Sequence, residues 1–250
     1  MKIGFFDSGR GGLLVAKSVQ DLMPQYEYIY YGDTAHVPYG ERAESEIYSL
    51  TKKGVAYLFE QDCALVVLAC NTASAETLRK LQDDWLPLHY PGRKILGVII
   101  PTIEEILKTE CRRVLLLATE RTVSAGKYHI ELGKRNELNT KIISQAATDL
   151  VPLIENDELK AAVQRAIEYI SRYLDRGEVV DGVILGCTHY SLLVGELRVC
   201  FPDITFFAQT EVIPSKLQMY LGKHDEIKSK LTTGGTLDTF LTGKKYIERE

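Results

Sequence analysis

ALVVLACNTASAETL spans Ala64 to Leu78, and DGVILGCTHYSLLVGEL spans Asp181 to Leu197. Each stretch starts with aliphatic residues typical of a buried strand, reaches a cysteine, continues with small polar residues and then takes on a helical pattern. A buried strand followed by a helix is the repeating unit of a parallel sheet. Ligands bind beyond the carboxyl ends of such strands, so Cys70 and Cys187 stand where a functional site belongs.

The rest of the chain alternates between strand patterns and helical patterns in the same way, which predicts an α/β protein. The predicted strands are Lys2–Phe6, Tyr26–Tyr31, Ala64–Ala69, Ile95–Ile99, Arg113–Leu117, Lys141–Gln145, Gly182–Leu185 and Thr205–Phe207. The predicted helices are Gly12–Met23, Glu44–Gln61, Ser74–Gln82, Thr102–Lys108, Val123–Arg135, Asn156–Arg176, Ser191–Cys200 and Pro214–Leu221. A chain of 250 residues is near the size at which a single core stops growing, and this favours two lobes.

The two halves of the chain correspond to each other. Asp7 and Thr119 follow matching strands, and their separation nearly equals that of Cys70 from Cys187, as a duplicated half-chain would give. We expect two similar lobes with mainly parallel sheets flanked by helices, related by a pseudo-twofold axis, with the active site in the cleft between them. The expected first lobe is 1–95 plus 208–250 and carries Cys70; the second is 96–207 and carries Cys187.

The composition argues against several classes of protein. With 45% hydrophobic and 26% charged residues, the chain can form a full core without disulfides or metals. The net charge of −4 and the scattered Lys and Arg residues argue against a nucleic-acid partner. No segment has the roughly 18 apolar residues of a membrane span, and Asp7 interrupts the apolar run where a signal peptide would need it. We expect a cytoplasmic protein with no membrane partner.

The chain has five cysteines, an odd number, and we find no secretory signal in it. Both observations predict reduced thiols. No pair has C-x-x-C spacing, and Cys187 with His189 alone is weak support for a metal, so we expect none. A buried hydrophobic role suits Cys63, Cys111 and Cys200.

A buried hydrophobic role suits Cys70 and Cys187 less well. Cys70 is followed by Asn71-Thr72 and Cys187 by Thr188-His189, and such polar groups have no role in an apolar core. A helix that begins just after a thiol favours the thiolate and should lower the pKa of the thiol. The residues by themselves leave reactive and inert thiols equally open.

Two loops also carry candidate site residues. Asp7–Gly12 (DSGRGG) matches neither standard phosphate-binding pattern, but its glycines would let backbone N–H groups approach a carboxylate. Asp7 there could be a helix cap or could orient a catalytic group. Tyr30–Glu44 (YYGDTAHVPYGERAE) is either a surface loop or a ligand loop, in which Tyr39 and Gly40 could offer backbone donors.

Six motifs together resemble those of a known family, and they occur in its order over nearly the whole chain. They are FDSGRGG (6–12), YYGDTAHVPYG (30–40), ACNTASA (69–75), GVIIPT (97–102), LVPLIE (150–155) and GCTHYSLL (186–193). The chain is similar to the glutamate racemases of the cofactor-independent Asp/Glu racemase superfamily. That resemblance implies interconversion of L-glutamate and D-glutamate without metal or other cofactor, D-glutamate supply for peptidoglycan, and a homodimer.

The resemblance also assigns roles to residues. It implies that Cys70 and Cys187 are the two acid/base groups, with Asp7 beside Cys70, His189 beside Cys187, and Glu155 as a supporting acid near the cleft. The residues that it implies for substrate contact are Asp7, Ser8, Tyr39, Gly40, Asn71, Thr72, Thr188 and His189.

Two thiols suit an inversion at Cα, because the proton leaves one face and returns to the other. An ordinary thiol costs about 2 kcal/mol to ionise at pH 7, which nearby donors and helix ends can partly offset. The carboxylate that gains charge must meet fixed donors in a dry site. By resemblance, Cys70 serves the D form and Cys187 the L form.

Some positions depart from the usual family pattern: His36 for Arg, Ser191 for Pro, Ala147-Thr148 for Cys-Pro and Gln209-Thr210 for Asp-Ser. Three other functions stay open. An aspartate racemase differs by one methylene of substrate, which changes hydrophobic binding by only about 1–3 kcal/mol. A cysteine hydrolase or transferase would use Cys187 with His189 and leave Cys70 unexplained. A non-catalytic amino-acid-binding protein would bind glutamate without exchanging its Cα hydrogen.

Overall fold

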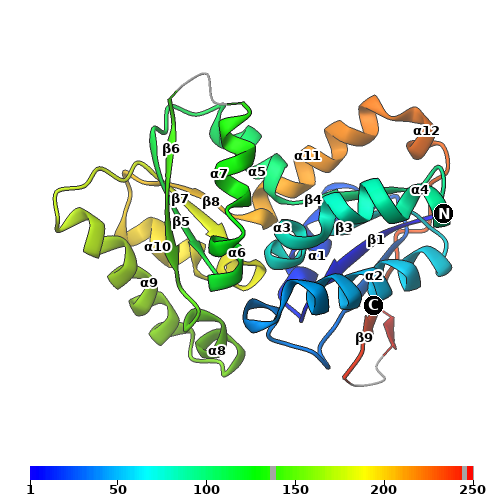
Figure 1. The fold of residues 1–250 in the computed structure, drawn as a ribbon, viewed down its shortest axis with the longest axis horizontal. Coiled ribbons are helices and arrows are strands. Elements are labelled where there is room, and N and C mark those ends of the chain that lie inside the picture. Colours follow the sequence, from blue (N-terminus) through cyan, green and yellow to red (C-terminus); the bar gives the residue numbers. More distant parts are fainter. Residues whose placement is uncertain (136–138, 244–246, 250) are drawn as a thin grey trace.

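The computed structural model describes residues 1–135, 139–243 and 247–249 and shows two lobes, each built on a sheet with helices on its faces (Figure 1). Among these residues the first sheet has the order β10-β9-β2-β1-β3-β4 and the second β6-β5-β7-β8. Every pairing is parallel except that of β10 with β9. The predicted class, two mainly parallel lobes flanked by helices, is confirmed.

The strands are β1 (Lys2–Asp7), β2 (Tyr28–Gly32), β3 (Cys63–Leu68), β4 (Lys94–Gly97), β5 (Arg113–Ala118), β6 (Lys141–Ala146), β7 (Gly182–Gly186), β8 (Thr205–Phe207), β9 (Leu237–Leu241) and β10 (Ile247–Arg249). The α-helices are α1 (Gly12–Leu22), α2 (Glu44–Glu60), α3 (Asn71–Lys80), α4 (Leu86–His89), α5 (Ile99–Ile106), α6 (Glu120–Ser124), α7 (Lys127–Gly133), α8 (Leu150–Glu155), α9 (Leu159–Leu174), α10 (Val194–Cys200), α11 (Gln209–Lys223) and α12 (Asp225–Lys228). Three further helical turns are η1 (Tyr39–Glu41), η2 (Leu81–Trp85) and η3 (Thr188–Leu193).

The two sheets share one topology. The order β2-β1-β3-β4 in the first lobe is repeated as β6-β5-β7-β8 in the second. This repetition is what a twofold relation between duplicated lobes requires, and it makes β3 the counterpart of β7. In the first sheet β2 lies on one side of β1 and β3 on the other, and in the second sheet β6 and β7 flank β5 in the same way. A crevice therefore opens between β1 and β3 and between β5 and β7. Cys70 and Cys187 follow β3 and β7, at these crevices.

The C-terminal part of the chain returns to the first lobe. β9 pairs in parallel with β2, and α11 packs along α1 (Figure 1). The sequence analysis missed β9 and β10. β9 was missed because the TTGGTLDTFL segment at 232–241 is rich in Thr and Gly and β9 has partly exposed residues along most of its length. The expected lobe boundaries at 95/96 and 207/208 stay predictions, and residues 136–138, 244–246 and 250 of those lobes lie outside the described residues.

Several helix boundaries differ from those expected, for local reasons. α11 begins at Gln209, and Pro214 lies inside it although proline was expected to open the helix. Pro101 lies in the first turn of α5, where its missing N–H costs nothing. Gly126, with φ of 62°, divides the helix expected over 123–135 into α6 and α7. Asp157, with φ of 61°, falls between α8 and α9, where one helix was expected to start.

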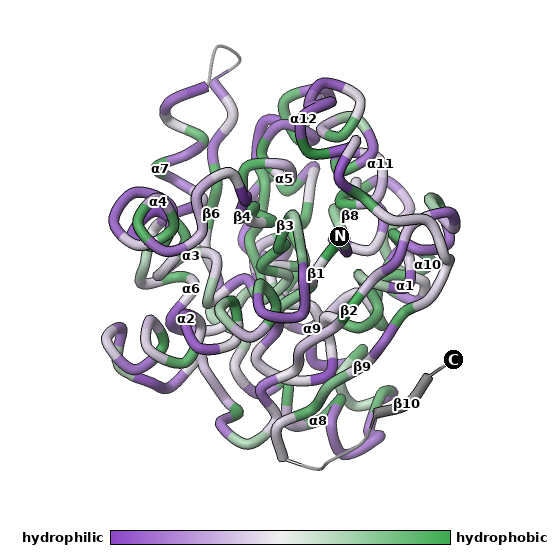
Figure 2. The backbone as a smooth tube through the Cα atoms, turned by 90° about the vertical axis from the view of Figure 1, so that its right-hand side faces the viewer, coloured by the Kyte–Doolittle hydropathy of each residue, from purple (hydrophilic) through white to green (hydrophobic). Residues whose placement is uncertain are grey.

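Each sheet is covered by apolar clusters on both faces. In the first lobe one cluster joins β1 and β3 to α1 and α11, and another joins them to α2 and α3. In the second lobe β5 and β7 pack against α9 and α10 on one side and against α5 and α7 on the other. Figure 2 shows hydrophobic residues along β3 and hydrophilic residues on outer helices such as α2 and α12. Among the described residues, none of the helices has the length and apolar character needed to cross a membrane.

Candidate active site

A cavity of about 270 Å³ lies between the lobes and is lined by both Cys70 and Cys187. The volume is near the lower end of the range for small-ligand sites, which suits a single amino acid. Its walls come from the segments that follow β1, β2, β3, β5, β6 and β7, including η1, and from α8. The lining residues are Ser8, Val37, Pro38, Tyr39, Gly40, Glu41, Cys70, Asn71, Thr72, Thr119, Thr148, Val151, Pro152, Glu155, Gly186, Cys187, Thr188 and His189.

Cys70 caps the N-terminus of α3. Its sulfur accepts a hydrogen bond from the Ala73 N–H at 3.5 Å and lies 3.3 Å from Ser8 Oγ. Burial, helped by the negative charge of Asp7, raises the pKa of the Cys70 thiol to about 12, although the hydrogen bonds with Ser8 and Ala73 oppose this rise. The expectation that the helix end would lower this pKa is therefore wrong in its net direction, because desolvation outweighs one backbone donor. Cys70 rests as a neutral thiol.

Cys187 stands beside an imidazole that is held from its other side. Its sulfur lies 3.7 Å from His189 Nδ1, and His189 Nε2 lies 2.6 Å from Glu155 Oε1. Burial lowers the pKa of His189, but hydrogen bonds to Cys187 and Glu155 and the charge of Asp7 outweigh burial and raise it to about 11. In turn, His189 lowers the pKa of Glu155. The predicted pairing of His189 with Cys187 is present, and Glu155 completes it.

Asp7 is fully buried at the end of β1. Its Oδ2 atom accepts hydrogen bonds from the N–H groups of Gly9 at 3.2 Å and Gly12 at 3.0 Å, while its Oδ1 has no partner among the described residues. Burial raises the pKa of Asp7, and the charge of His189 and these N–H groups oppose that rise. Two of the N–H groups expected to receive a ligand anion are thus taken by the carboxylate of Asp7 itself.

At Gly11 the loop after β1 of the first lobe closely approaches η3 of the second lobe, beside the cavity. A Cβ atom at Gly11 would lie 2.6 Å from Thr188 Oγ1 and 2.8 Å from His189 Nδ1. A side chain there would displace both groups. The glycines of the DSGRGG loop therefore serve approach between protein segments, where the sequence suggested approach to a ligand.

The loop that ends in η1 is fixed by a buried carboxylate. Tyr39 donates a hydrogen bond of 2.7 Å to Asp33 Oδ2, and His36 and Thr242 both contact Asp33 Oδ1 at 2.8 Å. The phenol of Tyr39 is therefore engaged by the protein, which leaves the backbone at Tyr39 and Gly40 as the part of the loop to face a ligand. His36, a departure from the family pattern, has a structural partner here.

Threonine hydroxyls join the lobes at the other wall of the cavity. Thr72 lies 3.0 Å from Thr119 and 3.1 Å from Thr122, and these two lie 3.0 Å apart, measured between Oγ1 atoms. A Cβ at Gly40 would lie 3.0 Å from Thr119 Cβ, so η1 also closes on this wall. The sequence placed Thr119 after a strand, at the end where ligands bind, but gave it no catalytic or substrate-binding role.

The family model described as Asp/Glu/Hydantoin racemase matches residues 14–214. The chain belongs to this racemase family. A glutamate racemase of Ruegeria pomeroyi (strain ATCC 700808 / DSM 15171 / DSS-3) is 33% identical over 100% of this chain and 98% of its own length. One from Jannaschia sp. (strain CCS1) is 36% identical over 94% of this chain and 92% of its own length. The prediction of an amino-acid racemase, an isomerase, is confirmed.

Solved racemases share the fold of the chain. The structure of glutamate racemase isoform RacE1 from Bacillus anthracis has a TM-score of 0.85 at 28% identity, over 97% of this chain and 89% of that one. A Francisella tularensis glutamate racemase solved with D-glutamate has a TM-score of 0.81 at 25% identity, over 96% of this chain and 88% of that one. An aspartate racemase from Picrophilus torridus, at 23% identity and a TM-score of 0.63 over 90% of this chain and 98% of that one, shares the fold alone.

The structure places every predicted site residue of the racemase at or beside this cavity. Ser8, Tyr39, Gly40, Asn71, Thr72, Thr188 and His189 line it with both cysteines and Glu155, while Asp7 lies buried behind Cys70 and His189. Sequence reasoning missed the lining residues Val37, Pro38, Glu41, Thr119, Val151, Pro152 and Gly186. Of the family departures, Thr148 lines the cavity and Gln209 contacts Asn71.

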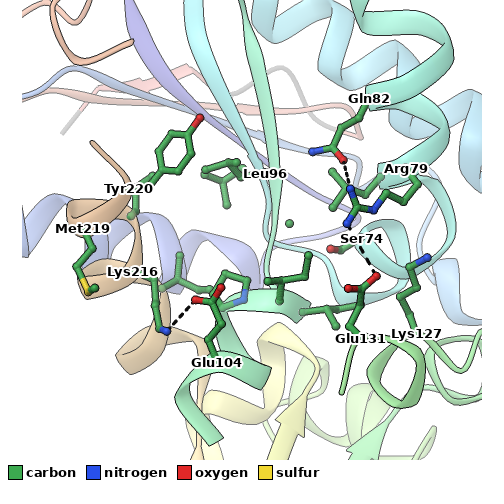
Figure 3. Close-up of a pocket in the computed structure, with 18 of the residues that line it drawn as sticks. Ser74, Arg79, Gln82, Leu96, Glu104, Lys127, Glu131, Lys216, Met219 and Tyr220 are labelled. Carbon is green, nitrogen blue, oxygen red and sulfur yellow. Dashed lines mark hydrogen bonds and ion pairs between the residues drawn. The ribbon is translucent and has the colours of Figure 1, made fainter. Parts of the chain in front are cut away.

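A second cavity, of about 300 Å³, has residues of α3, α5 and α11 among those that line it (Figure 3). Figure 3 shows two pairs of charged side chains on its walls, Lys216 with Glu104 and Arg79 with Glu131; their N–O distances are 3.0 and 3.9 Å. Neither cysteine of the first cavity lines it. Across residues 1–135, 139–243 and 247–249, no cluster of three or more His, Cys, Asp or Glu side chains has a metal-binding arrangement.

Proposed function

We propose that this racemase interconverts L-glutamate and D-glutamate by a two-base mechanism, with Cys70 on one face of Cα and Cys187 on the other. One observation carries the proposal: the two thiols follow equivalent strands of two lobes and line one cavity between them. A hydrolase with Cys187 and His189 alone would give no reason for the second thiol.

The charge balance of the cavity supports a thiolate that forms only with substrate present. The pKa of Cys70 is raised to about 12 by burial and by Asp7, so the free thiol keeps its proton at neutral pH. The α-ammonium group of an amino acid brings a positive charge into the same buried space, and an opposite charge nearby lowers the pKa of a thiol. We therefore expect ionisation of Cys70 to accompany substrate binding.

Cys187 has its own positive partner. The pKa of His189 is raised to about 11, so its imidazole is protonated at neutral pH and lies 3.7 Å from Cys187 Sγ. An imidazolium at this distance can return a proton to Cys187 when its sulfur has given one to the substrate. In the D-to-L direction Cys70 thiolate takes the Cα proton and the Cys187 thiol protonates the opposite face; the roles exchange in reverse.

The negative charge that develops as the Cα proton leaves resides on the substrate carboxylate. Cα–H is a very weak acid, so this charge must be met by donors that are already oriented in a site without bulk water. Asn71 and Thr72 in the first turn of α3 and Thr188 at the start of η3 supply backbone and side-chain donors on the two sides of the cavity.

Glutamate is the proposed substrate because the relatives that match at 33–36% identity over nearly full length are named glutamate racemases. The Francisella tularensis racemase was solved with D-glutamate. Aspartate is the second candidate, and the aspartate racemases among the solved structures share only the fold at 23% and 20% identity. Aspartate is therefore the less supported substrate.

The biological role follows from the substrate. We propose that the product D-glutamate supplies peptidoglycan synthesis, in the cytoplasm, by a homodimer. The five described cysteines are all free thiols, which fits a reducing compartment. The chemistry is proposed to need no cofactor, because Cys70 and Cys187 already provide the base and the acid.

The direct test is incubation of the purified protein with L-glutamate and, in parallel, with L-aspartate, in deuterated water without added cofactor. Racemisation of glutamate would appear as decay of the circular dichroism signal together with loss of the Cα proton resonance. Faster change with L-aspartate would assign the second candidate. Binding of glutamate with neither change would show a non-catalytic binding protein.

A further inference from the structure

Asn71, the residue after Cys70, is held by two side chains that do not line the cavity between the lobes. Tyr128 on α7 donates a hydrogen bond of 2.7 Å to Asn71 Oδ1, and Gln209 Nε2 donates one of 2.9 Å to the same oxygen. All three side chains are at most 2% exposed. The contact joins the first turn of α3 to the start of α11 and, across the lobes, to α7.

The two donors determine which group of the Asn71 amide, Oδ1 or Nδ2, remains available to bind a ligand. Both lone pairs of Oδ1 are used by Tyr128 and Gln209, so the amide oxygen cannot accept from a ligand. The Nδ2 group, in contrast, is buried with no hydrogen-bond partner in the described structure. A buried donor without a partner is costly and calls for an explanation in function.

A ligand carboxylate supplies that explanation. Asn71 lines the cavity between the two thiols, and a substrate carboxylate would satisfy Nδ2 there. Burial raises the pKa of Tyr128, so its phenol stays protonated and remains a donor toward Oδ1. Turning over the Asn71 amide alone would set its Nδ2 against Nε2 of Gln209. Turning Gln209 as well would restore a bond through its Oε1, which also has no partner in the described structure, but it would leave the Asn71 oxygen for the ligand, where it would repel a carboxylate.

We propose that Tyr128 and Gln209 are positioning residues of the racemase, which fix the Asn71 amide so that its Nδ2 group meets the carboxylate that gains charge as Cα is deprotonated. This inference rests on the proposed function and adds to it two residues that touch neither thiol. Tyr128 belongs to the second lobe and Asn71 to the first. Gln209 lies in the same lobe as Asn71, so it is the bond from Tyr128 that is formed only when the lobes are together.

A double-mutant cycle tests whether the two residues act through Asn71. We expect Tyr128→Phe and Gln209→Met each to lower kcat/KM for glutamate by about five- to tenfold, the worth of one buried hydrogen bond. In an Asn71→Ala background, the same two substitutions should change kcat/KM by less than about twofold, because the group that they orient is absent. Tyr28→Phe is the matched control, since it removes a buried phenol bond of 2.6 Å to Met23 O in the first lobe. It should leave kcat/KM unchanged.

The outcomes separate a positioning role from a structural one. Equal losses with and without Asn71 would overturn the proposal, because two residues that only support the fold act independently of it. Melting temperatures of all variants exclude simple unfolding. If Asn71→Ala turns over too slowly to measure, dissociation constants for D-glutamate by calorimetry replace kcat/KM in the same cycle, and additivity there also overturns it. A wild-type protein that does not racemise glutamate would refute the proposed function, and the calorimetric cycle would still decide this inference.

Discussion

Nε2 of His189 lies 2.6 Å from Oε1 of Glu155, while Nδ1 of the same ring faces Cys187 at 3.7 Å. The imidazole thus links a carboxylate at the mouth of the cleft to one of the two thiols inside it. Because Glu155 helps to raise the pKa of His189 to about 11, the positive charge beside Cys187 is maintained through neutral pH. The first prediction follows from this pair.

Glu155→Gln is expected to lower the pKa of His189, because it removes a negative partner and keeps the shape. His189 would then lose its proton at a lower pH, and the alkaline limb of the kcat/KM profile should move to lower pH. The loss of kcat/KM should be about tenfold near pH 8 and smaller at pH 6, where the ring is protonated in both proteins. Rates measured from pH 6 to pH 10 check this. Glu158→Gln, three residues further on, is the control, and a profile that does not move would contradict the role of Glu155.

Cys70→Ser and Cys187→Ser should each abolish racemisation while sparing exchange with one enantiomer. A serine hydroxyl is too weak an acid to serve as the base, and we expect racemisation to fall by about 10²–10⁴-fold. By the proposed assignment, Cys70→Ser should retain Cα hydrogen exchange with L-glutamate and Cys187→Ser with D-glutamate. Proton NMR in deuterated water measures both. Full racemisation by either variant would end the two-base proposal, and Cys200→Ser, at an exposed thiol, should behave as wild type.

Gly11→Ala should damage the site through one methyl group. The added Cβ would lie 2.6 Å from Thr188 Oγ1 and 2.8 Å from His189 Nδ1 and would move both. We expect the free energy of unfolding to fall by about 1–3 kcal/mol and kcat/KM to fall by about 10–100-fold. Gly195→Ala in α10 is the control, because its Cβ would meet nothing within 4 Å. Chemical denaturation and initial rates on both variants would expose the difference, and equal behaviour would count against this close approach.

Thr119→Val should weaken the cavity wall formed by three hydroxyls. It keeps the shape of the side chain but breaks contacts of 3.0 Å with both Thr72 and Thr122. We expect KM for glutamate to rise by about fivefold, because Thr72 loses a partner next to the substrate. Thr119→Ser retains the hydroxyl and should restore most of the affinity. If KM for glutamate is as high in the Ser variant as in the Val variant, the loss of affinity comes from changed packing and not from the lost hydrogen bonds.

The free energy of unfolding should fall as pH rises from about 9 to about 12. Burial raises the pKa of Cys70 from 9.0 to about 12, so in this window the unfolded chain releases a proton that the folded protein still holds. The stabilisation is complete below pH 9 and is lost as pH approaches 12. Urea titrations at several pH values should show a shallower decline for Cys70→Ser. Cys63, whose pKa is also raised to about 12 by burial, provides a second thiol of the same kind away from the cleft; an unchanged slope for both serine variants would refute the argument.

Much of the fold could be predicted because it depends on local pattern. Buried parallel strands such as β3 and β7 are continuous aliphatic runs, and the polar residues that follow them mark the ends where ligands bind. β9 could not be found in this way, since its pairing with β2 is formed by residues about 200 positions apart in a segment rich in Thr and Gly. Pro214 lies inside α11 although a proline favours the first turn of a helix, and Gly126, in the left-handed region, ends the helical pattern locally between α6 and α7.

The sequence by itself determined that two cysteines stand at equivalent strand ends, and its motifs were enough to identify the family. Only the tertiary structure decided which groups surround each thiol. The raised pKa of Cys70 arises from burial beside Asp7, which lies on a different strand, and the partner of His189 is Glu155 from another helix. Desolvation and charge pairing depend on distances between segments that are remote along the chain, and these distances exist only after the lobes have folded and met.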